Sequence, residues 1–115
     1  MAIQTATMKN TLSDAYKAAA THGAVYTTAP GGSAGTEPSG GSPAYARKAL
    51  SWGASSNGVT SATPVAFDIP SGSTIVGAGV HSALTAGTYL DGGAVTSQVF
   101  SSQGTYTITF TFTQT

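Results

Sequence analysis

The sequence contains no cysteine. Disulfide bonds, thiolate nucleophiles and cysteine metal sites are therefore excluded. No run approaches the ~20 consecutive apolar residues of a membrane-spanning helix. The first residues also lack a basic segment followed by an apolar one, so we expect no secretory signal and a chain that is made and used without export.

Charge is also scarce. Charged residues make up 7% of the chain and the formal net charge is zero, whereas about 25% is usual for soluble domains. Four basic residues offer no positive surface for nucleic acid and no charged face for a membrane, so neither partner is expected.

Uncharged hydroxyl groups take the place of the missing charges. Serine and threonine occupy 33 positions. A surface with so few charges is poorly protected against association. We therefore expect a surface that is covered by neighbouring proteins or that meets solvent as a neutral polar coat. A mildly sticky monomer stays open as the alternative.

The clearest structural signal lies at residues 105–113, where aromatic and aliphatic side chains alternate with threonines. Because successive side chains of a strand point to opposite faces, one face is apolar and the other carries hydroxyls. The pattern predicts a strand that forms one wall of the core. Further strands are predicted at 24–28, 44–52, 63–69, 74–81, 88–90 and 94–100, with turns at Ser55-Ser56-Asn57-Gly58 and Asp91-Gly92-Gly93.

A helix is predicted at residues 5–20, with Thr5 or Thr7 as its N-cap and Gly23 just beyond its end. Its apolar side chains fall on one stripe, which comprises Met8, Leu12, Ala15, Tyr16 and Ala19. This stripe could cover one side of a sheet or dock on another subunit. Residues 29–43 follow as a long loop rich in glycine, serine and proline, which we expect to order against a partner, with a floppy insertion as the alternative.

Together these elements predict a single domain over residues 1–115. Its fold class is mainly β, an antiparallel β-sandwich or jelly-roll-like barrel of about seven or eight short strands with one N-terminal helix.

Groups that could carry chemistry are few and dispersed. The acids Asp14, Glu37, Asp68 and Asp91 are far apart in the sequence, and two histidines make no zinc ligand set. No serine lies in a nucleophile-elbow pattern. We therefore expect no enzyme, cofactor or metal.

The one concentration of charge is Arg47-Lys48, between Tyr45 and Trp52. Arginine and aromatic residues dominate interface hot spots, and the guanidinium could pair with Glu37 or Asp68. An intramolecular pair that braces the long loop is equally compatible. The candidate interface residues are Tyr16, Glu37, Tyr45, Arg47, Lys48 and Trp52.

Four short stretches carry distinctive turn and strand motifs, residues 40–49 (GGSPAYARKA), 67–70, 76–83 and 87–90. Together they resemble small virion structural proteins of tailed phages that infect actinobacteria. Residues 40–49 are similar to a Gly-Gly-x-x-Tyr-Ala-Arg stretch of that family. Residues 67–70 (FDIP), 76–83 (VGAGVHSA) and 87–90 (GTYL) match its Phe–Pro pair, its Val-Gly strand and its hairpin. The motifs are turns and strands, not catalytic groups.

The resemblance implies a structural protein of the virion, assembled in the host cytoplasm. We expect a minor capsid or capsid-decoration subunit that contacts the major capsid protein or other virion proteins. A homo-oligomer is expected, with a trimer favoured. The alternatives are a tail-fibre or tail-tip component that contacts the host, and a carbohydrate-binding module in which Trp52 and Tyr45 stack on sugars.

Overall fold

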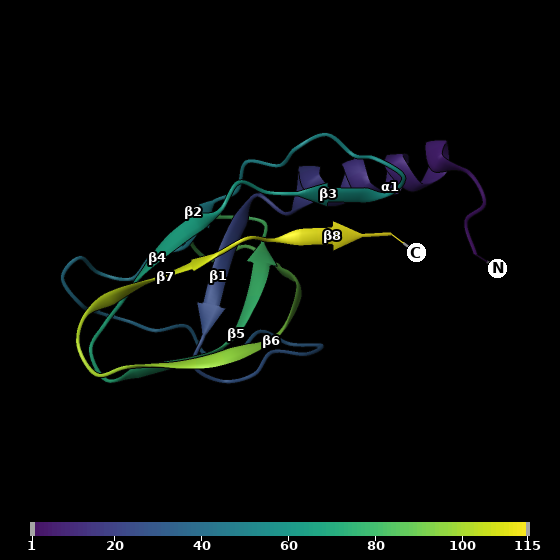
Figure 1. The fold of residues 1–115 in the computed structure, drawn as a ribbon. Coiled ribbons are helices and arrows are strands. Elements are labelled where there is room, and N and C mark those ends of the chain that lie inside the picture. The colour runs from purple at the N-terminus through teal and green to yellow at the C-terminus, as the bar shows by residue number, and fades with distance from the viewer. Residues whose placement is uncertain (1, 115) are drawn as a thin grey trace.

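The computed structural model describes residues 2–114 and is mainly β, with antiparallel sheets and one N-terminal helix (Figure 1). This confirms the predicted fold class. The elements are α1 (Ala6–Ala19), β1 (His22–Tyr26), β2 (Lys48–Ala49), β3 (Val59–Ser61), β4 (Val65–Ile69), β5 (Ser73–His81), β6 (Tyr89–Phe100), β7 (Gly104–Ile108) and β8 (Thr111–Thr113).

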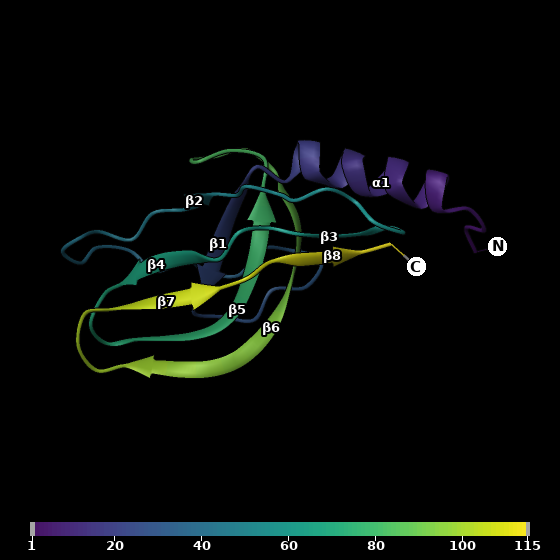
Figure 2. The same ribbon diagram turned by 45° about the horizontal axis from the view of Figure 1, so that its top comes forward.

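Four strands form one sheet in the order β2-β1-β5-β6. Strand β4 follows β3 closely in the chain, and β8 follows β7. The β3–β8 and β4–β7 pairs are therefore formed by the same two chain segments, residues 59–69 and 104–113. They therefore make one long two-stranded ribbon, which runs past the four-stranded sheet toward α1 (Figure 2). The molecule is elongated as a result, with extents of 47 × 23 × 23 Å.

The core lies between the β4–β7 part of the ribbon and the four-stranded sheet. Its buried side chains come from both layers and are Val25, Phe67, Ile69, Ile75, Ala78 and Phe100. Burying a side chain such as phenylalanine or isoleucine contributes about 1.5–3 kcal/mol. The period-two pattern of β4 supplies Phe67 and Ile69, as the sequence predicted.

The C-terminal stretch keeps its alternation but is not one continuous strand. Its apolar residues from Tyr106 to Phe112 are half-buried, and the threonines between them are exposed. The strand is interrupted at residues 109–110, although the Phe110 carbonyl there still accepts a hydrogen bond from the Ala62 N–H at 2.8 Å. The stretch is therefore β7 followed by β8.

Two strand predictions need correction. Only Lys48–Ala49 of residues 44–52 is a strand, as β2. Asp91-Gly92-Gly93 is not a hairpin loop, because these residues pair with β5 inside the long strand β6. The turn at 55–58 is confirmed: Asn57 and Gly58 have φ of 51° and 80°, and β3 begins directly after them.

The first part of the 29–43 loop lies against the four-stranded sheet, and residues 41–43 lie against Pro70 and Gln103 in the β4–β5 and β6–β7 turns. A methyl group on Gly77 of β5 would overlap Pro30. The Tyr89 hydroxyl of β6 donates to the Gly31 carbonyl at 2.8 Å, and Pro38 is buried. The loop thus packs on its own domain, and the expectation that it orders against a partner stays a prediction.

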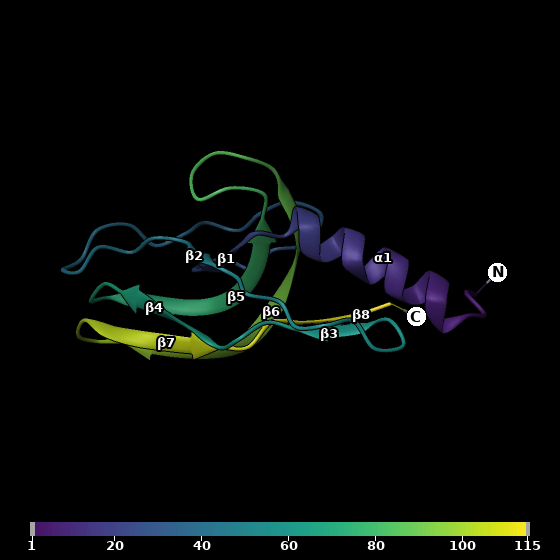
Figure 3. The ribbon, with the colours of Figure 1, turned by 90° about the horizontal axis from the view of Figure 1, so that it is seen from above.

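Helix α1 begins at its predicted cap, since the Met8 N–H donates to Thr5 Oγ1 at 3.2 Å. It ends at Ala20, and Gly23 lies inside β1 instead of closing the helix. Seen from above, α1 runs beside the β3–β8 end of the ribbon (Figure 3). Its one fully buried residue is Ser13, not a member of the apolar stripe. Of the predicted apolar stripe, only Tyr16 packs against a strand, on Phe112 of β8, and Met8, Leu12, Ala15 and Ala19 are exposed.

Candidate functional site

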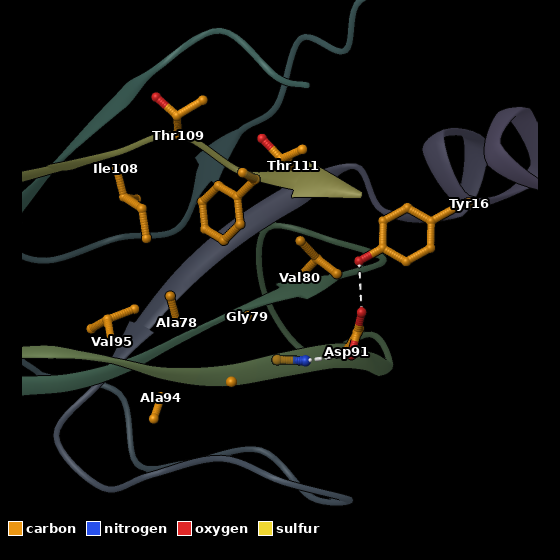
Figure 4. Close-up of a pocket in the computed structure, with 13 residues that line it drawn as sticks. Tyr16, Ala78, Gly79, Val80, Asp91, Ala94, Val95, Ile108, Thr109 and Thr111 are labelled. Atoms are coloured by element: carbon orange, nitrogen blue, oxygen red, sulfur yellow. Dashed lines mark hydrogen bonds between the residues drawn. The ribbon is translucent and has the colours of Figure 1, made fainter. Parts of the chain in front are cut away.

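A groove of about 240 Å³ opens between the two layers (Figure 4). Residues 78–80 of β5 and 91–95 of β6 line one side, residues 108–111 line the other, and Tyr16 of α1 stands at one end. The lining is apolar where Val95 and Ile108 face the core and polar where Asp91 meets the helix. Ile108 and Phe110 are only half-buried because they line this groove between the layers.

The polar end of the groove is a phenol–carboxylate contact. The Tyr16 hydroxyl donates to Asp91 Oδ2 at 3.0 Å, and the Gly92 N–H donates to Oδ1 at 2.9 Å. Burial, and next the bond to Asp91, raise the pKa of Tyr16 above its ordinary value. The phenol therefore stays protonated at neutral pH and acts as a donor that ties α1 to β6.

Aromatic packing fastens α1 to the ribbon. The Tyr16 ring stacks on Phe112 of β8 with centroids 3.8 Å apart, and Trp52 meets the Tyr16 ring edge-on at 5.9 Å. Trp52 Nε1 donates to the Ala20 carbonyl at 2.8 Å. These contacts hold the helix at the far end of the molecule.

A second cluster, which we call the Arg47 clasp, joins two loops. Arg47 Nε donates to Glu37 Oε1 at 2.8 Å. The same guanidinium donates to the Ala83 and Ala86 carbonyls at 3.0 and 2.9 Å. The clasp therefore binds the 29–43 loop to the β5–β6 turn, where Leu84 lines a shallow groove of about 240 Å³.

Beneath the clasp lies His81, which is only 3% exposed. Its Nε2 is 2.6 Å from the Tyr26 hydroxyl and 3.7 Å from Glu37 Oε1. Burial and then the Arg47 charge lower the pKa of His81, while Glu37 acts in the opposite direction. A neutral imidazole hydrogen-bonded to a phenol is the arrangement that this site favours near neutral pH.

Each of the six candidate interface residues contacts another part of its own chain. Tyr45 packs on Phe67 at 6.2 Å and accepts from the Val25 N–H at 3.2 Å. Lys48 Nζ lies 3.7 Å from Asp68 Oδ2. For Arg47 the structure realises the intramolecular alternative, a brace on the long loop. A role of these residues at an interface stays a prediction.

The rings of Tyr45 and Trp52 pack on different aromatic partners, Phe67 and Tyr16, and their role in stacking on sugars stays a prediction. Sequence reasoning missed the contacts of His81 and Asp91, whose partners lie 55 and 75 residues away. No local pattern signals pairs so distant.

Within residues 2–114, no group of three or more histidine, cysteine, aspartate or glutamate side chains could hold a metal ion. No helix in the described part of the chain has the length and apolar character to cross a membrane.

Comparison with protein families decides the affiliation. Residues 3–114 match the model of the family described as podophage GP4 fiber I protein gp80. The chain belongs to this gp80 family. Membership confirms a phage virion structural protein. It gives no support to phages of actinobacteria in particular or to a minor capsid position. No curated protein and no solved structure matches the chain.

Proposed function

We propose that this member of the gp80 family is a fibre subunit that works through contacts with other virion proteins. The observation that carries the proposal is the match over residues 3–114 to a family described by a podophage fibre protein. Because the match spans nearly the whole chain, it concerns the complete sandwich with its helix and not one shared motif.

The shape of the molecule supports this role. A body of 47 × 23 × 23 Å places the sheets at one end and α1 with the β3–β8 ribbon at the other (Figure 1). Strands at the borders of both layers keep one backbone edge without a partner strand in the described chain. Such edges are available for pairing with another protein.

The surface chemistry supports it as well. The outward side chains of β7 and β8 are threonines, and the formal net charge of the chain is zero. Contacts made by such a surface depend on shape, apolar burial and hydroxyl hydrogen bonds, so they are little weakened by salt. That a fibre contains three copies stays a prediction.

The direct test is to label purified virions with antibody fragments against this chain and image them by electron microscopy. Label along fibres is expected. Label spread over the head would contradict the fibre role and favour a capsid subunit. A matched preparation from phage that carries an epitope tag on the major capsid protein provides the control for head labelling.

A further inference from the structure

Helix α1 docks on its own domain through the Tyr16 ring, which stacks on Phe112, and through a row of polar side chains. Asn10 Oδ1 accepts from the Gly58 N–H at 2.8 Å. Ser13, which is fully buried, accepts from the Ser55 hydroxyl at 2.9 Å. A surface helix normally turns its apolar side toward the core and its polar side toward water. In α1 polar side chains face the ribbon beside Tyr16, and the other apolar side chains of the stripe do not.

The apolar side chains of the helix other than Tyr16 are exposed to solvent. Met8 and Leu12 are 49% and 39% exposed, and Ala15 and Ala19 are exposed as well. At 3.6 residues per turn these four residues share one narrow stripe, roughly a third of a turn from the docked side. We call this set, Met8, Leu12, Ala15 and Ala19, the outer stripe.

The spacing of the outer stripe indicates what covers it. Its members follow one another at intervals of four, three and four residues, which is the a/d seam of a coiled coil over about two heptads. The side chains of such a seam insert between those of a second helix with the same spacing. Since α1 is the only helix among residues 2–114, the partner that this chain itself supplies is α1 of a second copy.

The charges of α1 permit this contact. Lys9, Asp14 and Lys17 all lie off the outer stripe, and Lys17 Nζ pairs with Asp14 Oδ1 of its own helix at 3.1 Å. The neighbours of the stripe on the side away from the ribbon are Thr11 and Ala18, both uncharged and exposed. Two copies can therefore bring their stripes together without opposing like charges.

We propose that the outer stripe of α1 packs against the outer stripe of a second copy, joining two subunits helix to helix. A helix of 14 residues is about 21 Å long, so this contact alone buries less than the ~1,200–2,000 Å² of a standard interface. Between free subunits the contact is therefore transient, so that it is detected by covalent trapping, and it becomes persistent where neighbouring copies are held close together in a particle.

Because the chain has no cysteine, single-cysteine variants report the contact cleanly. A disulfide requires two Cα atoms about 4.4–6.8 Å apart, which residues of a seam satisfy. Under mild oxidation Ala15→Cys should give several-fold more cross-linked dimer than Ala18→Cys, an exposed alanine of the same helix off the stripe. Equal yields from the two variants would overturn the proposal.

A second comparison keeps the test independent of folding defects. In the Ala15→Cys chain, adding Leu12→Glu should abolish cross-linking, and adding Thr7→Glu, the same charge off the stripe, should leave it intact. Fluorescence of Trp52 checks that α1 remains docked in each variant. Unchanged cross-linking with Leu12→Glu would rule the seam out. The experiment uses the purified chain, so its outcome does not depend on where the protein lies in the virion.

Discussion

Replacing Arg47 by methionine removes the Arg47 clasp while keeping a long side chain. The change deletes the bond to Glu37 Oε1 at 2.8 Å and both bonds to the Ala83 and Ala86 carbonyls. It leaves the Glu37 carboxylate of the 29–43 loop without its cation. Two loops that are far apart in sequence lose their common anchor.

The expected loss follows from burial. The side chains of Arg47 and Glu37 are only 14% and 23% exposed, so water screens their contact poorly. A hydrogen bond to a charged group contributes about 1.5–3 kcal/mol. The two carbonyls lie in a surface turn and regain water, so we take the ion pair as the main loss. The free energy of unfolding should fall by about 2–4 kcal/mol, a large part of the ~5–15 kcal/mol of a typical domain.

The neighbouring cation provides the control. Lys48 lies 3.7 Å from Asp68 and its side chain is 38% exposed, and exposed pairs of this kind contribute about 0–1 kcal/mol. Lys48→Met therefore removes the same charge at little cost. Urea unfolding followed by the fluorescence of the single tryptophan measures both variants.

Equal unfolding midpoints for Arg47→Met and Lys48→Met would refute the reasoning, because loss of one positive charge would then explain both results. A cycle with Glu37→Gln separates the pair itself from other effects of each substitution. We expect a coupling energy of about 0.5–3 kcal/mol between Arg47 and Glu37, and a value near zero would place the stabilisation elsewhere.

Two further predictions concern the packing of the 29–43 loop on the sheet and the burial of His81 at the end of β5. Gly77→Ala should lower the free energy of unfolding by about 1–3 kcal/mol, because its methyl group would overlap Pro30, and it should speed proteolysis within residues 29–43. Gly93→Ala is the control, because a Cβ at Gly93 meets open space. Equal protease resistance of the two variants would contradict the packing of Pro30 on Gly77. Because the pKa of His81 is lowered by folding, the unfolded chain takes up a proton below pH about 6.5 that the folded chain does not. Stability should therefore fall as the pH drops from about 6.5 toward that lowered pKa, and His81→Gln should flatten this fall. A His81→Gln variant whose pH profile matches that of the unchanged chain would exclude His81 as the cause.

Local patterns predicted those parts of the fold in which neighbours along the chain settle the structure. The alternation at 65–69 and 105–113 depends only on which side chains share a strand face. The Asn57-Gly58 turn depends on residues that accept positive φ. These predictions held because tertiary packing reinforced the same preference.

Elsewhere distant contacts decided the structure where local preference did not. Gly92 and Gly93 are turn residues by composition, yet β5 pairs with them and absorbs them into β6. The 29–43 loop has no apolar periodicity, yet Pro30 fits over the bare backbone of Gly77. The energy in both cases comes from a partner strand or sheet that no short window of sequence contains.

The sequence by itself determined the class of the fold, the spacing of the helix stripe and the neutral, hydroxyl-rich character of the surface, since all three follow from residue type and period. Only the tertiary structure decided that α1 docks by Tyr16 and its polar side chains and leaves the rest of its apolar stripe exposed, that Arg47 braces two loops, and that His81 is buried beneath them. Those outcomes depend on residues 10–75 positions apart. These residues come together only when the layers pack on one another. The same packing decides which side of helix α1 is buried and which side meets water.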